Sequence, residues 1–137
     1  MELVKENVET AQVVLLQALG KEQGQFLSHG NGEVFLQNGI RGLGEVFILE
    51  KLSNNRVALR CTSKEKGLYL SHAFDKLWLQ NGIQGEGEEW ELVVHSPNKV
   101  SFNCYGKEKG KTLSHAFDKM WLQNGYQGEG ELWDMQD

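Results

Sequence analysis

The sequence predicts an all-β fold of three equivalent units, because one block of residues occurs three times. The block LSHAFDKLWLQNGIQGEGE at 70–88 returns at 113–131 with two changes in nineteen positions. A more diverged copy at 27–45 keeps eleven of the nineteen residues. The copies follow one another at a constant spacing of 43 residues. A fixed period of this length is the signature of a repeat architecture, so the repeats decide the fold.

Within each repeat, apolar residues alternate with polar ones, which is the pattern of strands with one buried face. We expect one domain over residues 1–137, with repeats at about 14–56, 57–99 and 100–137. Each repeat is expected to hold four short strands, with the third and fourth separated by a glycine-rich turn. The first strands include 14–16, 57–59 and 100–102; the second, 25–28, 68–71 and 111–114; the third, 34–36, 77–79 and 120–122; and the fourth carry the inward pairs Phe47 and Leu49, Trp90 and Leu92, and Trp133 and Met135.

Twelve short strands in three repeats of about 40 residues predict a β-trefoil closed around a pseudo-threefold axis. Helical repeats of similar length are excluded because the apolar spacing is 2 and not 3.6. A propeller normally needs four or more blades. We expect the segment before residue 14 to complete the outer edge of the first repeat.

Composition narrows the classes of partner. Of the 137 residues, 39% are apolar and 24% are charged, which is typical of a globular chain. The formal net charge is -5 with no basic stripe, so nucleic acid and anionic membrane surfaces are disfavoured as partners. The longest apolar run, at 13–16, is too short to insert into a membrane. With no visible signal peptide, the sequence predicts a soluble protein that is cytoplasmic or is secreted by another route.

The two cysteines occupy equivalent places in two repeats. Cys61 and Cys104 are 43 residues apart, and Ala18 stands at the same place in the first repeat. A small apolar filler is the expected role for this position. A disulfide would require the position to lie near the symmetry axis.

Two stretches of the second repeat carry a family resemblance. RVALRCTSKEKGLYLSHAF and EEWELV resemble the trefoil repeats of fascin and hisactophilin and, more distantly, ricin-type lectin domains. The similarity extends from about residue 14 and lies mostly in core positions, so it bears on fold more than on function. The chain has four histidines where hisactophilin has many, and Glu88-Glu-Trp90 and Glu131-Leu-Trp133 stand near the place of the ricin-type Gln-x-Trp signature. The resemblance implies either carbohydrate binding, commonly of galactose or N-acetylgalactosamine, or actin binding.

The repeated residues that a core does not require are the candidates for function. The segments flanking the block have diverged more than the block itself, although passive retention after a recent duplication is the alternative. Trp78 and Trp121 are expected to face outward beside Gln80 and Gln123. An exposed indole can stack on the C–H face of a sugar while amides and carboxylates bind its hydroxyls. The alternative is that each tryptophan packs under its own loop.

The sequence therefore predicts two matching ligand sites and a weaker third one. The three repeated histidines suit a structural hydrogen bond in the turn as well as a ligand contact. The first repeat is weaker because Phe35 replaces the tryptophan and Leu43 replaces the glutamate. The first site comprises His72, Asp75, Lys76, Trp78, Gln80, Asn81 and Glu86; the second comprises His115, Asp118, Lys119, Trp121, Gln123, Asn124 and Glu129; and the third comprises His29, Gln37 and Asn38.

A multivalent lectin is the leading hypothesis for function. No nucleophile or phosphate-loop motif is present, and the candidate carboxylates occur twice, so we expect no catalytic residue, metal or cofactor. The expected partners are glycans on cell-surface glycoproteins or glycolipids, with agglutination as the effect. A homodimer would double the number of sites. The alternative is a fascin-like or hisactophilin-like module that binds or bundles actin, which the net charge of -5 disfavours because actin is acidic.

Overall fold

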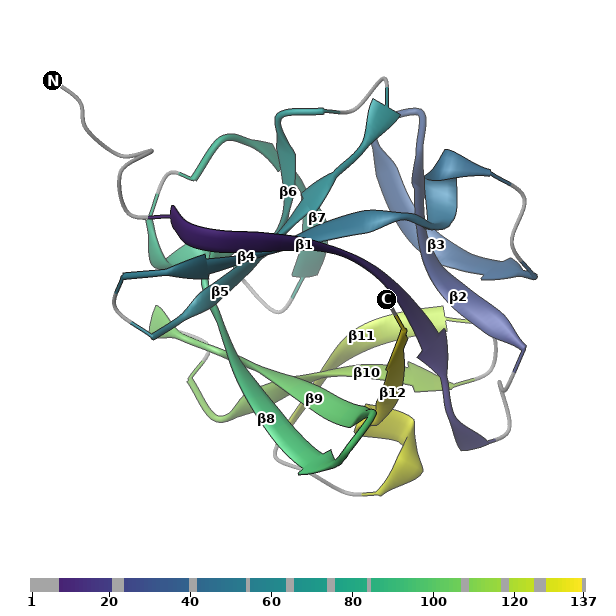
Figure 1. Cartoon of the computed structure of the whole chain (residues 1–137). Coiled ribbons are helices and arrows are strands. Elements are labelled where there is room, and N and C mark those ends of the chain that lie inside the picture. The colour runs from purple at the N-terminus through teal and green to yellow at the C-terminus, as the bar shows by residue number, and fades with distance from the viewer. Residues whose placement is uncertain are drawn as a thin grey trace, which may run out of the picture.

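The structure is a computed structural model that describes residues 8–20, 24–39, 42–53, 55–63, 66–73, 76–83, 85–106, 109–116, 119–124 and 128–136. In these ranges the strands form three consecutive groups of four, as the repeats predict (Figure 1). A 3-10 turn precedes the fourth strand of each group. The first group is β1 (Val8–Ala18), β2 (Gln25–Gly30), β3 (Glu33–Asn38), η3 (Leu43–Glu45) and β4 (Phe47–Leu52); the second is β5 (Val57–Cys61), β6 (Leu68–Ala73), β7 (Lys76–Asn81), η5 (Glu86–Glu88) and β8 (Trp90–Ser96); the third is β9 (Lys99–Cys104), β10 (Lys111–Ala116), β11 (Lys119–Asn124), η7 (Glu129–Glu131) and β12 (Trp133–Gln136).

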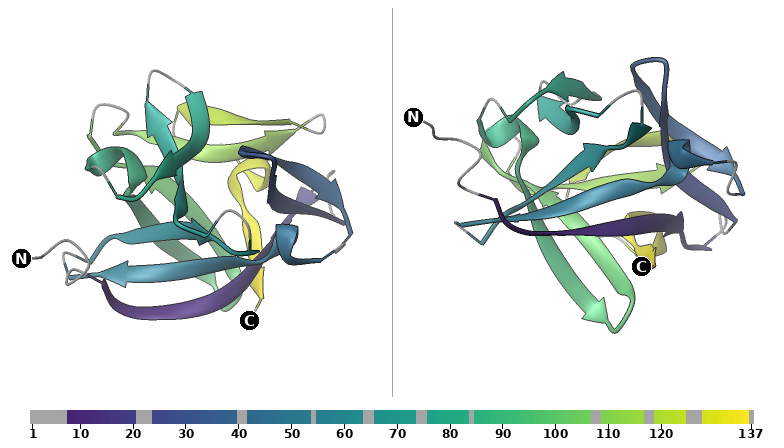
Figure 2. Two further views of the ribbon diagram at one scale, coloured as in Figure 1. Left: turned by 90° about the horizontal axis from the view of Figure 1, so that it is seen from above. Right: turned by 45° about the horizontal axis from the view of Figure 1, so that its top comes forward.

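Six of these strands close a barrel of antiparallel pairs. β1 pairs with β4, β4 with β5, β5 with β8, β8 with β9, β9 with β12, and β12 with β1. The other six form the hairpins β2–β3, β6–β7 and β10–β11, which lie at three places around the centre of the molecule (Figures 1 and 2). A six-stranded barrel with three hairpins is the β-trefoil arrangement, which confirms the predicted fold class.

The threefold relation holds at the level of single residue pairs. The first strand of each repeat places a valine opposite the aromatic residue that opens the fourth strand. The pairs are Val14–Phe47, Val57–Trp90 and Val100–Trp133. On the other side, each aromatic residue faces a small residue of the next first strand: Cys61, Cys104 or Ala18. Both cysteines are buried in the core, as expected of small apolar fillers beside large rings.

The core also satisfies the polar atoms that its large rings bring inside. Trp90 donates its indole N–H to the carbonyl oxygen of Leu70 at 3.1 Å, and Trp133 donates to that of Leu113 at 3.4 Å. A buried indole N–H needs such an acceptor. Leu77 and Leu79 of β7 pack against the same core, so the predicted inward direction of the third strand is correct.

Strand β1 is longer than the repeat pattern predicts. It begins at Val8, and its N-terminal part runs along β4 from the pair Val8–Leu52 to the pair Val14–Phe47, with an irregularity after Val8. The side chain of Val13 in this part is 56% exposed. Residues 8–13, the part of this segment that the structure describes, therefore extend the first strand along β4. No helix in the described part of the chain is long and apolar enough to cross a membrane.

A buried polar network joins the first two repeats. Tyr69 is buried and donates its hydroxyl to Oε1 of Glu50 at 2.8 Å, while Arg60 Nε donates to Oε2 of the same carboxylate at 2.8 Å. Burial, followed by the hydrogen bond to Glu50, raises the pKa of Tyr69 above its ordinary value. Ionisation of this hydroxyl is therefore linked to unfolding.

We expect the free energy of unfolding to fall as the pH rises above about 10, because the unfolded chain then loses the Tyr69 proton while the folded protein keeps it. The stabilisation that the protonated Tyr69 hydroxyl contributes is fully present below that pH. It is lost progressively as the pH rises toward the higher pKa of Tyr69 in the folded state. Urea denaturation at a series of alkaline pH values measures it. The Tyr69→Phe variant should show a shallower alkaline decline, and an equal decline in both proteins would contradict the assignment.

Candidate functional site

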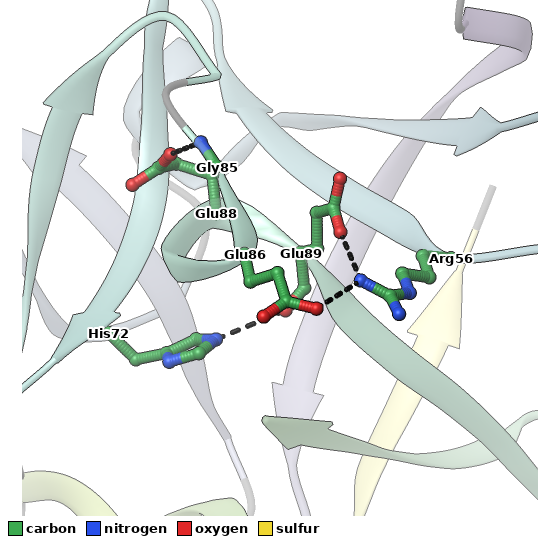
Figure 3. A network of polar contacts seen from close by, with 6 residues as sticks. All are labelled: Arg56, His72, Gly85, Glu86, Glu88 and Glu89. Atoms are coloured by element: carbon green, nitrogen blue, oxygen red, sulfur yellow. Dashed lines mark hydrogen bonds and ion pairs between the residues drawn. The ribbon is translucent and has the colours of Figure 1, made fainter. Parts of the chain in front are cut away.

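The three repeated histidines lie in the interior. His29, His72 and His115 are 4%, 1% and 0% exposed, and each ring stands edge-on to the core aromatic residue of its own repeat, at centroid distances of 4.9, 4.6 and 4.8 Å. Nε2 of each ring lies 3.1, 3.0 and 2.9 Å from the carbonyl oxygens of Val46, Glu89 and Leu132 (Figure 3). Because a carbonyl oxygen only accepts, Nε2 of His72 and of His115 donates to it. Nε2 of His29 also lies 3.4 Å from the backbone nitrogen of Thr62. Of the two predicted roles, the structural hydrogen bond is present in all three repeats. The burial of the rings leaves them almost no surface for a ligand, so their role as ligand contacts stays a prediction.

Replacing His72 with Leu is expected to lower the free energy of unfolding by about 1–3 kcal/mol, because the partly buried carbonyl of Glu89 loses a donor. Binding of any ligand by the folded variant should be unchanged. Chemical denaturation and ligand titration measure the two effects separately. Unchanged stability together with lost binding would show that His72 contacts the ligand. Lys51→Ala, a change at an exposed position, serves as the control.

The repeated glycine-rich turn is also a structural element. The buried side chains of Glu45, Glu88 and Glu131 accept hydrogen bonds through Oε1 from the backbone N–H of Gly42, Gly85 and Gly128, at 3.0, 3.1 and 2.8 Å. A Cβ added to Gly87 would lie 3.2 Å from the carbonyl oxygen of His72, so a larger residue would require the turn or β6 to move by a few tenths of an ångström. The recurrence of the sequence GxGE is thus explained by folding.

The side chain of Glu86 pairs with an arginine that precedes β5. Its Oε2 pairs with Nη1 of Arg56 at 2.9 Å, and the same nitrogen lies 2.6 Å from Oε1 of Glu89 (Figure 3). The guanidinium of Arg56 also lies 4.0 Å from the ring centroid of Tyr105. These contacts tie the turn η5 to the start of β5 and the end of β9. That Glu86 joins Trp78 in a ligand site stays a prediction.

The equivalent Glu129 also lies against the next repeat. A Cβ added to Gly20 would lie 3.2 Å from Cβ of Glu129, which places this exposed glutamate beside the residues that follow β1. Like Glu86, it is positioned between repeats.

Trp78 and Trp121 lie on the outer face of their hairpins, as predicted. Both are half-buried, and each donates its indole N–H to the side-chain oxygen of the glutamine two residues later, Gln80 at 3.1 Å and Gln123 at 3.0 Å. The residue between each tryptophan and its glutamine, Leu79 or Leu122, packs into the core. Each indole and amide therefore form one unit, held in a fixed orientation on the outer face of the strand.

Residues from all three repeats line one pocket where the hairpins meet. Trp121, Lys119 and Lys76 line a pocket of about 520 Å³ together with residues of β3. The lysines are exposed and equivalent, while Glu33 holds the same place in the first repeat. The other lining residues are Val34, Phe35, Leu36, Leu77 and Met120. The sequence predicts a separate site in each repeat, whereas the structure brings these residues together on a shared pocket.

Several other residues of the predicted sites are not among those that line this pocket. Asn38, Asn81 and Asn124 are exposed at the ends of β3, β7 and β11, and Gln37 is half-buried on β3. Asp75 and Asp118 lie outside the described residues. Sequence reasoning missed Phe35 and Met120 as pocket residues, although Phe35 occupies the same repeat position as Trp121.

No group of three or more His, Cys, Asp or Glu side chains in the described ranges lies close enough together to hold a metal ion. The candidate site consists instead of aromatic rings, amides and lysines, which can combine apolar contact with hydrogen bonding to a polar ligand.

Comparison with known proteins gives structural relatives only. No protein-family model and no curated protein sequence matches the chain. Among solved structures, SeviL bound to asialo-GM1 saccharide is 12% identical, with 92% of this chain and 97% of that chain covered and a TM-score of 0.73. The designed threefold symmetric protein ThreeFoil is 17% identical, with 91% and 98% covered and a TM-score of 0.72. The BEL β-trefoil is 14% identical, with 95% and 96% covered and a TM-score of 0.70. Identities this low show similarity of fold alone, and by that fold the chain is a β-trefoil protein.

Proposed function

We propose that the protein binds carbohydrate through the outer surface of its hairpins. The observation that carries the proposal is the indole–amide unit, which occurs with the same geometry at Trp78–Gln80 and at Trp121–Gln123. A half-exposed ring offers an apolar surface to the C–H groups of a sugar, and the adjacent amide offers polar atoms to its hydroxyls. SeviL, which has the same fold, has a structure with a bound saccharide. The protein would act by binding and not by catalysis.

The pocket between the hairpins provides the concave part of this surface. Its volume of about 520 Å³ lies within the range of small-molecule sites. Trp121 contributes the aromatic wall, while Lys76 and Lys119 contribute ammonium donors for hydroxyl oxygens. Glu33 stands at the place of these two lysines in the first repeat.

Galactose or N-acetylgalactosamine is the proposed sugar class, on glycans of cell-surface glycoproteins or glycolipids. Two matching indole–amide units on one rigid scaffold provide two points of attachment. A single shallow sugar site is weak, about millimolar. Two sites on one body raise the avidity for a multivalent surface by roughly 10² to 10⁴. A homodimer would double the number of sites again.

A glycan array followed by erythrocyte agglutination tests the proposal. We expect binding to galactose-terminated glycans and agglutination that free galactose or N-acetylgalactosamine inhibits and mannose does not. Inhibition by mannose alone would retain carbohydrate binding and change the sugar class. Absence of glycan binding together with co-sedimentation with actin filaments would replace the proposal with the actin-binding alternative.

A further inference from the structure

One of the three equivalent junctions between repeats lacks the large side chain that fills the other two. Phe26 and Tyr69 occupy the same place in the first and second repeats and are 7% and 9% exposed. Thr112 stands at this place in the third repeat. The equivalence is confirmed by strand pairing, because the three residues face Gln17, Arg60 and Asn103 on the first strand of their own repeats. A threonine fills much less volume than an aromatic ring, so this junction is open.

A pocket of about 400 Å³ lies at the open junction. Its walls come from β8, from β9, from the start of β10 and from the turn between β9 and β10. The β8–β9 hairpin extends away from the body of the molecule (Figure 2), so one side of the pocket is carried by a projecting element. The lining includes His95, Ser101, Asn103, Tyr105, Lys109 and Thr112.

Polar groups on the pocket walls are held in place by one another. Thr112 donates its hydroxyl to Oδ1 of Asn103 at 2.9 Å, and Nδ2 of Asn103 donates to Oε1 of Glu91 at 3.1 Å. Within the β8–β9 hairpin, Nε2 of His95 lies 2.8 Å from Oγ of Ser101. Thr112 and Ser101 are 2% and 1% exposed, so their hydroxyls belong to the floor and not to the open surface. Such a prearranged set of donors and acceptors costs little to order when a ligand binds.

At the corresponding junction of the first two repeats, other residues occupy the same space. The hydroxyl of Tyr69 bonds there to Glu50, which pairs with Arg60. At the junction of the second and third repeats, Val93 and Asn103 stand where the first junction has Glu50 and Arg60, so the ion pair is replaced by an apolar residue and an amide. The open pocket is thus a specific difference between otherwise equivalent repeats.

Charge and shape indicate the class of ligand. Glu91 and Lys109 supply one charge of each sign, so the rim favours no strongly charged molecule. Tyr105 supplies an aromatic wall, and its ring is held against the guanidinium of Arg56. We propose that this pocket binds one neutral polyhydroxylated ring, such as a pyranose, and that it occurs once per chain. This site uses strands β8 to β10 and does not depend on the hairpin surface proposed above.

Titration of the isotope-labelled full chain with galactose, glucose and mannose, each to millimolar concentrations and followed by amide NMR, tests the site. We expect at least one sugar to shift the amides of β9 and the start of β10. In the Thr112→Phe variant these shifts should be reduced at least tenfold at equal sugar concentration. Phe is chosen because Phe26 already fills this place in the first repeat, whereas a tyrosine would direct its hydroxyl toward Val93.

Two further variants keep the test decisive. Asn103→Ala removes the central amide without filling the pocket and should weaken the same shifts, which covers the case in which Thr112→Phe does not fold. The double variant Trp78→Ala/Trp121→Ala should leave them intact. Amide shifts confined to β7 and β11 would support the hairpin surface and overturn the pocket at Thr112. Amide shifts confined to β9 and β10 would support the pocket at Thr112 and count against the hairpin surface. No shifts in β9 and β10, or shifts that persist in folded Thr112→Phe, overturn it.

Discussion

Replacing both Trp78 and Trp121 with Ala is expected to abolish agglutination while the protein still folds. Each substitution removes the aromatic surface of a proposed sugar site and leaves its glutamine without the indole donor. Loss of both attachment points removes the avidity gain, a fall of roughly 10² to 10⁴ in binding to a multivalent surface. Glycan-array binding of the two proteins at equal concentration measures the effect, with circular dichroism to verify the fold.

The single variants give a sharper comparison. Trp121 lines the pocket between the hairpins, and Trp78 is not among its lining residues. We therefore expect Trp121→Ala to weaken binding more than Trp78→Ala does. Trp78→Phe and Trp121→Phe keep an aromatic ring and should retain most of the binding. Binding that persists unchanged in the double Ala variant would remove the indole–amide units from the site.

The second large effect is on stability and concerns the other two tryptophans. Trp133→Ala is expected to lower the free energy of unfolding by about 3–5 kcal/mol, the usual cost of removing a large buried aromatic side chain. Trp133 is 0% exposed, and its ring packs against His115 at a centroid distance of 4.8 Å. The substitution opens a cavity in the core and removes the indole donor from the carbonyl of Leu113.

Urea denaturation of four variants measures this difference. Trp78→Ala, at a half-buried position, should cost much less than Trp133→Ala. Trp90→Phe provides the matched control, because Phe47 already occupies the equivalent place and packs against His29 in the same edge-on manner. Trp90→Phe should therefore be milder than Trp90→Ala. Equal destabilisation by Trp78→Ala and Trp133→Ala would contradict the division into core and surface tryptophans.

Sequence reasoning succeeded where the pattern itself carries the structural information. Alternation of apolar and polar residues placed Leu79 inward and Trp78 and Gln80 outward, and the structure agrees. The repeat period placed Val57 and Trp90 in equivalent positions of successive repeats, and the strand register matches. The same reasoning could not choose between two roles for His72, because a polar residue that recurs in every repeat can satisfy the backbone of the fold as readily as it can bind a ligand.

The sequence by itself determined the three repeats, their four strands and the direction in which most side chains point, because these depend on local alternation and on a period that can be counted. Only the tertiary structure decided which surfaces are hollow. The pocket at Trp121 exists because closure of the three repeats brings β3, β7 and β11 together. The pocket at Thr112 exists because one repeat lacks a side chain that the other two have. Both are spaces between segments far apart along the chain, and no local pattern records the space that remains after such segments have packed.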